Sequence, residues 1–190
     1  MLLSVLIPTI PERTGMFKRL VAFLQFQLKW LGQESRCEIL QSAGEESIGA
    51  KRNELIQRAH GEYCVFIDDD DWVSSRYMWH VLDALSQKDK PDCVGVFGPV
   101  FFGEGYYGMM YNSLQYHDWN FDGKGKWFRP PTRWNPMKTA LARQVQYRDI
   151  SSSEDYHWTL EMRDRKLIKT EAQATEPLYY YYGRPPFRPL

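Results

Sequence analysis

A short apolar strand that runs directly into four consecutive aspartates constrains this chain most strongly. Residues 63–67 read Tyr-Cys-Val-Phe-Ile, and Asp68 to Asp71 follow without a break. Four like charges at the end of a buried strand repel one another unless a cation lies among them. Ligands of α/β proteins bind beyond the carboxyl ends of the strands, so the cluster predicts a ligand site at that edge of a sheet. The alternative is a solvated acidic turn or an aspartate-rich helix start.

Carboxylate oxygens of this kind suit hard divalent cations. Such cations often complete their coordination with substrate phosphates. We therefore expect Mn²⁺ or Mg²⁺ at the aspartate cluster.

The first hundred residues alternate between strand and helix patterns, which is typical of a parallel sheet covered by helices. Residues 99–134 are rich in glycine and aromatic side chains and predict antiparallel strands and long loops. Strands are predicted at 3–8, 37–41, 62–68, 92–97, 167–171 and 177–182, and helices at 15–31, 47–59, 75–86 and 153–165.

Bulk properties exclude several classes of protein. The chain has 190 residues, and its 24 basic and 24 acidic side chains give no global attraction to a polyanion. Its three cysteines have no metal-type spacing and predict free, buried thiols in a reducing compartment. The apolar residues 1–8 lack a basic start and predict a strand, not a signal peptide. No apolar run approaches the roughly 18 residues of a bilayer span, so we expect a cytoplasmic protein.

A second segment that could contribute to a ligand site is residues 47–53. Ser47 is a candidate cap for a helix whose first turns carry Lys51 and Arg52. Free amides at a helix start favour anions, and these two cations would add charge-assisted contacts to a diphosphate. A solvated helix face with a Lys51–Glu54 pair explains the segment equally well.

A third segment, residues 151–157, offers a candidate general base. Ser151 and Glu154 fit a capping box, which accounts for Glu154 but not for Asp155. A carboxylate at a helix start beside aromatic residues is suited to proton abstraction. His157 is a weaker second candidate.

The fourth feature is an asymmetry of charge. Residues 123–148 contain seven basic side chains and no acid, with tryptophan and phenylalanine between them. The segment predicts either a solvated basic flap or a surface for the phosphates of a nucleotide or a polyanionic acceptor. We favour a mobile flap over a diphosphate. The basic residues are Lys124, Lys126, Arg129, Arg133, Lys138, Arg143 and Arg148.

Together these segments resemble a family 2 glycosyltransferase with the GT-A fold. The similar segments occur in the family's order and cover most of the chain. They are the opening strand at 4–9, an Ala-Lys-Arg-Asn segment at 50–53 with Gly-Glu-Tyr at 61–63, an Asp-X-Asp metal motif within 66–72, and a Glu-Asp…Leu…Arg helix at 154–163.

The resemblance implies one mixed, mainly parallel GT-A domain over 1–190, with a nucleotide-binding half at 1–98 and an antiparallel, loop-rich acceptor-binding half at 99–190. It also implies that Asp68 and Asp70 hold the metal and that Asp155 deprotonates the acceptor hydroxyl. The implied donor-binding residues are Pro8, Thr9, Arg13, Lys51, Arg52, Asp68, Asp69, Asp70 and Glu154.

The sequence departs from the family where an acidic turn normally helps to read the base. Residues 40–46 read Leu-Gln-Ser-Ala-Gly-Glu-Glu, so Gln41 or Glu45 would have to substitute.

The predicted function is a metal-dependent, inverting transfer of sugar from a UDP-sugar to an acceptor hydroxyl. A glycan, a lipid-linked glycan and a modified nucleic acid remain open as acceptors, and the oligomeric state is open too. The rival functions are a nucleotidyltransferase that acts on a sugar phosphate and a non-catalytic protein that binds sugar or nucleic acid.

Overall fold

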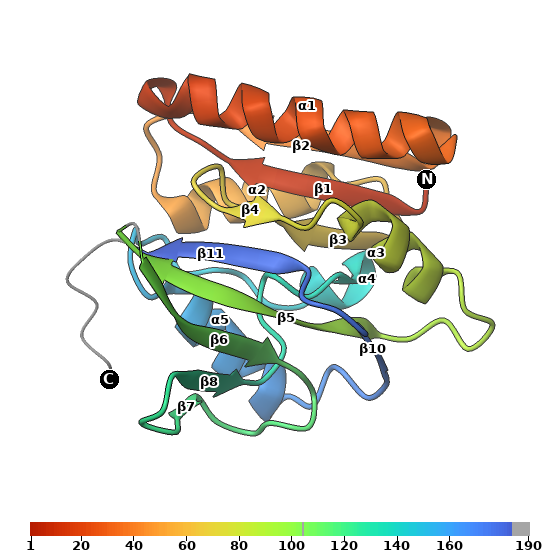
Figure 1. The fold of residues 1–190 in the computed structure, drawn as a ribbon. Helices are drawn as coiled ribbons and strands as arrows, with labels where there is room; N and C mark the ends of the chain where they lie inside the picture. Colours follow the sequence, from red (N-terminus) through yellow and green to blue (C-terminus); the bar gives the residue numbers. More distant parts are fainter. Residues whose placement is uncertain (104, 184–190) are drawn as a thin grey trace.

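The computed structural model describes residues 1–103 and 105–183 and shows a mixed sheet with helices on both sides (Figure 1). The strands are β1 (Leu3–Pro8), β2 (Cys37–Ser42), β3 (Tyr63–Phe66), β4 (Trp72–Val73), β5 (Cys93–Phe102), β6 (Gly105–Asn112), β7 (Asn120–Phe121), β8 (Lys126–Arg129), β9 (Met137–Lys138), β10 (Glu171–Gln173) and β11 (Tyr179–Gly183). The α-helices are α1 (Thr14–Leu31), α2 (Ile48–Arg58), α3 (Tyr77–Leu85), α4 (Thr139–Ala142) and α5 (Glu154–Asp164). Two 3₁₀ turns, η1 (Pro11–Arg13) and η2 (Glu34–Arg36), complete the order.

The predicted parallel core is confirmed. Strand β1 lies between β2 and β3 and is parallel to both. Strand β9 then lies antiparallel between β3 and β5, so β5 runs in the same direction as β3. Beyond it, β5 and β6 form the antiparallel pair expected in the second half, and β8 and β7 extend it.

Alternate side chains of β1 pack into two separate cores, which is why the whole strand is buried and all its residues except Ser4 are apolar. Leu3, Val5 and Ile7 face α1 and α3, whose apolar residues complete the larger core. Leu6 faces the opposite side and packs in the second core with α2 and α5. The first core includes Leu20, Leu24, Leu28, Met78 and Val81, and the second includes Leu55, Ile56, Trp158 and Met162.

Several predicted boundaries shift. The strand expected at 167–171 is instead β10, because Lys169 and Thr170 donate their amides to the Asp92 carboxylate and do not join a sheet. The strand expected at 92–97 continues to Phe102, where β6 and β11 flank it.

The three cysteines are buried and free, as predicted. Within residues 1–103 and 105–183, no helix has both the length and the apolar character that a bilayer span requires.

Candidate active site

A cavity of about 400 Å³ lies beyond the carboxyl ends of β1 and β3. The ten residues assigned to the metal, the donor or the base all line this one cavity, although they come from four separate segments. They are Pro8, Thr9, Arg13, Lys51, Arg52, Asp68, Asp69, Asp70, Glu154 and Asp155. The other lining residues are Ile10, Glu46, Ile48, Arg133, Ser151 and Tyr181.

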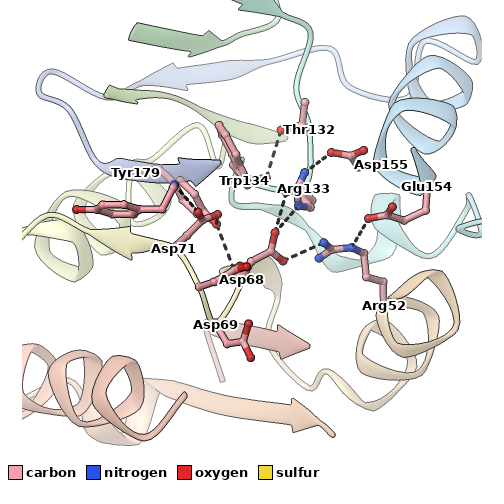
Figure 2. Close-up of polar contacts among 12 residues, drawn as sticks. Arg52, Asp68, Asp69, Asp71, Thr132, Arg133, Trp134, Glu154, Asp155 and Tyr179 are labelled. Carbon is pink, nitrogen blue, oxygen red and sulfur yellow. Dashed lines mark hydrogen bonds and ion pairs between the residues drawn. The ribbon is translucent and has the colours of Figure 1, made fainter. Parts of the chain in front are cut away.

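Arginine side chains of the chain itself supply part of the positive charge that the aspartate cluster requires. Asp68 lies between two buried guanidinium groups, with Arg52 Nη2 2.9 Å from one oxygen and Arg133 Nη2 2.7 Å from the other (Figure 2). Burial alone would raise the pKa of Asp68, but Arg133 and Arg52 hold that pKa well below its usual range. The alternative of a solvated acidic turn is therefore excluded.

The other three aspartates have different surroundings. Asp69 accepts hydrogen bonds from Thr9 Oγ1 at 2.6 Å and from Arg13 Nη1 at 2.8 Å. Asp71 does not line this cavity and accepts hydrogen bonds from Tyr179 Oη at 2.7 Å and from the Tyr182 amide at 2.8 Å, so we assign it a structural role.

Asp70 is the most open of the four carboxylates, with 28% of its side chain exposed, against 15% for Asp68 and 1% for Asp69. It lies 2.8 Å from Arg13 Nη1. Burial and the charge of Asp68 nevertheless raise the pKa of Asp70. A further cation beside Asp70 would therefore stabilise its ionised form.

Arg52 joins the aspartate cluster to α5. It is 2% exposed, its Nε lies 3.2 Å from Glu154, and its guanidinium stacks 4.9 Å from the Phe66 ring centroid. The predicted Ser151–Glu154 capping box is wrong. Ser153 precedes the helix with φ of 61° and caps no amide, while Glu154 turns inward to Arg52.

Lys51 lies in the cavity wall and is 3% exposed. Its ammonium donates to Thr9 O at 2.9 Å, and Glu54 is engaged by Ser42 and Arg58. The alternative of a solvated Lys51–Glu54 pair is therefore wrong. Ser47, in contrast, caps α2 as predicted by accepting from the Ala50 amide.

Arg133 is a site residue that the sequence did not predict to contact the aspartate cluster. It contacts the carboxylates of both Asp68 and Asp155 and so connects the aspartate cluster to the candidate base (Figure 2). Its position depends on a loop in which buried Asn135 accepts from the Thr132 amide and donates to carbonyls of Val94 and Asn112. The sequence signal for this role is the excess of aspartates at 68–71 over cations close to them in the sequence, because such an excess requires cations from other segments.

The sequence predicted Arg133 to be among the seven cations of one basic flap over residues 123–148. In the structure these cations do not form a single flap. Lys138 pairs with Asp92 at 2.8 Å, and Arg143 donates to the Ala59 carbonyl at 2.7 Å just after α2. Arg129 and Arg133 are both buried. The seven cations therefore have different surroundings and do not form one surface.

Three weaker candidates lie outside the cavity lining. His157 packs edge-on against Tyr156, 5.6 Å between ring centroids. Gln41 and Glu45, suggested as base readers, do not line the cavity, whereas Glu46 does.

Comparisons with known proteins agree with this architecture. The family model for glycosyl transferase family 2 matches residues 19–164. No curated protein sequence matches the chain.

The structure is similar to that of TarS residues 1–349 from S. aureus, with a TM-score of 0.64 and 15% identity over 96% of this chain and 60% of that one. The same TarS fragment in complex with UDP-GlcNAc gives a TM-score of 0.59 at 14% identity over 97% of this chain and 59% of that one. GalNAc-T7 with UDP, GalNAc and Mn²⁺ gives 0.57 at 13% identity over 97% and 44%. These likenesses establish a GT-A fold, and the chain spans less than two thirds of each of these structures.

Proposed function

The chain belongs to glycosyl transferase family 2, and from this we propose that it transfers a sugar from a UDP-sugar to an acceptor hydroxyl with inversion at the anomeric carbon. The observation that carries the proposal is the convergence of all ten predicted residues on one cavity. The presence of UDP-GlcNAc in a TarS structure, and of UDP in structures of TarS and GalNAc-T7, supports a uridine nucleotide as the donor.

The cavity residues fit a divalent metal that is completed by the donor. No group of three or more metal-ligating side chains is preassembled in the described parts of the chain. However, Mg²⁺ commonly binds through one or two carboxylates plus substrate phosphates. Asp70 is open to the cavity and would hold the ion, and Asp68 would be its second carboxylate. Mn²⁺, which is present in the GalNAc-T7 structure, is the other candidate. When bound, the ion would supply positive charge to the diphosphate leaving group.

The protein's own cations would contribute to the same task. The Lys51 ammonium has donors beyond its bond to Thr9, and it lies in the cavity wall near the start of α2. We assign it to the donor diphosphate, together with Arg13. The buried Lys51 charge acts strongly on a developing anion because little water screens it, and Arg13, with 25% of its side chain exposed, is screened more.

Asp155 is the proposed general base. One of its oxygens contacts Arg133, and the other accepts the Tyr156 amide at 2.8 Å, so the carboxylate is held in one orientation at the cavity wall. It would take the proton of the acceptor hydroxyl as that oxygen attacks from the face opposite the leaving group. Glu154 is assigned to orienting Arg52.

The test is release of UDP from UDP-GlcNAc with Mn²⁺, with and without a chelator. We expect Asp155→Asn to reduce turnover by roughly 10² or more with UDP affinity unchanged. Asp164→Asn removes the same charge from the exposed end of α5 and should behave as wild type. Asp70→Asn should abolish turnover and weaken metal-dependent UDP binding.

Full turnover in excess chelator would refute the metal assignment. An inactive Glu154→Gln beside a normal Asp155→Asn would refute the base. UDP-GlcNAc binding without any turnover would favour the non-catalytic rival. No feature of the cavity favours the nucleotidyltransferase.

A further inference from the structure

Arg129, the last residue of β8, is a buried cation for which the described residues 1–103 and 105–183 supply no ion pair. It is 9% exposed, and its guanidinium carbon lies 3.8 Å from the Trp119 ring centroid and 6.0 Å from that of Trp134. Arg52 and Arg133 each contact two carboxylates. Among the residues that the structure describes, the Arg129 side chain forms no hydrogen bond or ion pair, and its nitrogens are not fully enclosed.

Arg129 does not itself line the cavity of about 400 Å³, and its links to the site are the charge of Asp155 and the ring of Trp119. Asp155 is the carboxylate whose charge favours the charged form of Arg129, while burial and Arg133 oppose it. Burial lowers the pKa of Arg129 to about 10, so the group remains charged at neutral pH. Trp119, which covers the guanidinium, also contacts Tyr156 next to Asp155, at 5.3 Å between ring centroids.

A buried charge without a partner is costly, and a contact with an aromatic face offsets only a small part of that cost. The planar fork of a guanidinium matches the two oxygens of a phosphate or a carboxylate. A ligand that carries such a group would satisfy Arg129, as Asp68 and Asp155 satisfy Arg133.

We propose that Arg129 binds an anionic group, phosphate or carboxylate, on the acceptor. This inference rests on the proposed function, because it is the role of Asp155 as base that makes the neighbouring ligand the acceptor. The donor diphosphate is assigned elsewhere, to Lys51, Arg13 and the metal at Asp70. The transfer site would thus select a negatively charged acceptor.

The direct test is NMR observation of the Arg129 Nε–Hε resonance, assigned by its absence from Arg129→Met. Protein saturated with UDP is titrated with inorganic phosphate in one arm and with acetate in the other. We expect a saturable shift of this resonance in at least one arm, and the arm that gives it identifies the anion. Lys126→Gln, which removes an exposed cation from the same strand, should leave the shift unchanged.

A second measurement compares UDP release from UDP-GlcNAc with glucose, glucose 6-phosphate and glucuronate as acceptors. Wild type should prefer an anionic acceptor, and Arg129→Met should lose about tenfold or more of that preference, the usual effect of a charged hydrogen bond. Release to water should not change. Since Arg129→Met removes an unpaired charge, its Tm should equal or exceed that of wild type.

Three results would overturn the proposal: no shift with either anion, an equal loss of release to water in Arg129→Met, or a lower Tm with the anionic preference retained. The last would show that Arg129 only supports packing. Absence of UDP release with every acceptor would instead overturn the proposed function, while the NMR titration would still decide whether Arg129 binds anions.

Discussion

Replacing Arg52 by methionine should show how much of the fold depends on charges inside the site. The guanidinium is 2% exposed and lies 2.9 Å from Asp68 and 3.2 Å from Glu154. Asp68 would retain Arg133, but Glu154, with 8% of its side chain exposed, would lose its cation. Methionine would still pack on Phe66, so the main loss is electrostatic.

Leaving one buried charge without its partner typically costs about 3–5 kcal/mol. For a chain of this size, each kcal/mol lowers Tm by roughly 2–4 °C, so we expect a decrease of about 6–20 °C. With a urea m-value of about 2 kcal/mol/M, the midpoint should fall by about 1.5–2.5 M. Urea titrations followed by circular dichroism measure this directly.

The control is the double variant Arg52→Met/Glu154→Leu, which removes both charges. It should recover about 2 kcal/mol of the loss, because no uncompensated carboxylate remains. Two results would contradict this expectation: a loss below about 1 kcal/mol in Arg52→Met, or a loss in the double variant equal to the sum of those in Arg52→Met and Glu154→Leu.

Three further predictions concern other parts of the chain. Burial alone would raise the pKa of Asp92, but a lysine ammonium and two backbone amides lower it. Asp92→Asn should therefore lower the free energy of unfolding by about 1–2 kcal/mol at pH 7. In urea titrations, this difference from wild type should decrease and vanish as the pH falls below about 4, where the Asp92 carboxylate becomes protonated. Burial raises the pKa of Cys64 to about 12, and since all three cysteines are buried, the native protein should not react with Ellman's reagent at pH 8 until guanidinium unfolds it. A Cβ at Gly49 would lie 1.8 Å from the Arg148 carbonyl oxygen, so Gly49→Ala should lower the free energy of unfolding by about 2 kcal/mol or more. A Cβ at Gly15 would have nothing within 4 Å, so Gly15→Ala should leave the thermal stability unchanged or raise it.

The parts of the site that sequence reasoning found are those that follow directly from strand and helix patterns. Thr9 and Asp68 come just after β1 and β3, and those strands are parallel neighbours, so their loops share one edge of the sheet. Lys51 and Asp155 lie in the first turns of helices that approach the same edge. Their convergence could therefore be anticipated without coordinates.

What sequence reasoning missed depends on contacts between distant segments. Arg133 reaches the site because Asn135 ties its loop to Val94 and Asn112, which are 41 and 23 residues away. No local pattern encodes that contact, so seven cations that are neighbours in sequence were taken for one surface. The capping box failed for a related reason, since Arg52, 102 residues from Glu154, competes for its carboxylate.

The last strand, β11, supplies contacts to the site that can form only late in synthesis. Tyr179 supplies the hydroxyl that donates to Asp71 and accepts the Asp68 amide, and these contacts span 108 and 111 residues. A ribosome that adds about 5–20 residues per second needs roughly 5–20 s to make that stretch. The Asp68 amide and the Asp71 carboxylate must therefore remain without Tyr179 for that time, whereas Thr9 and Arg13, the partners of Asp69, are already present. The parallel strands β1 to β3 can pair earlier, but the contacts of Tyr179 with Asp68 and Asp71 form only when β11 docks against β4 and β5.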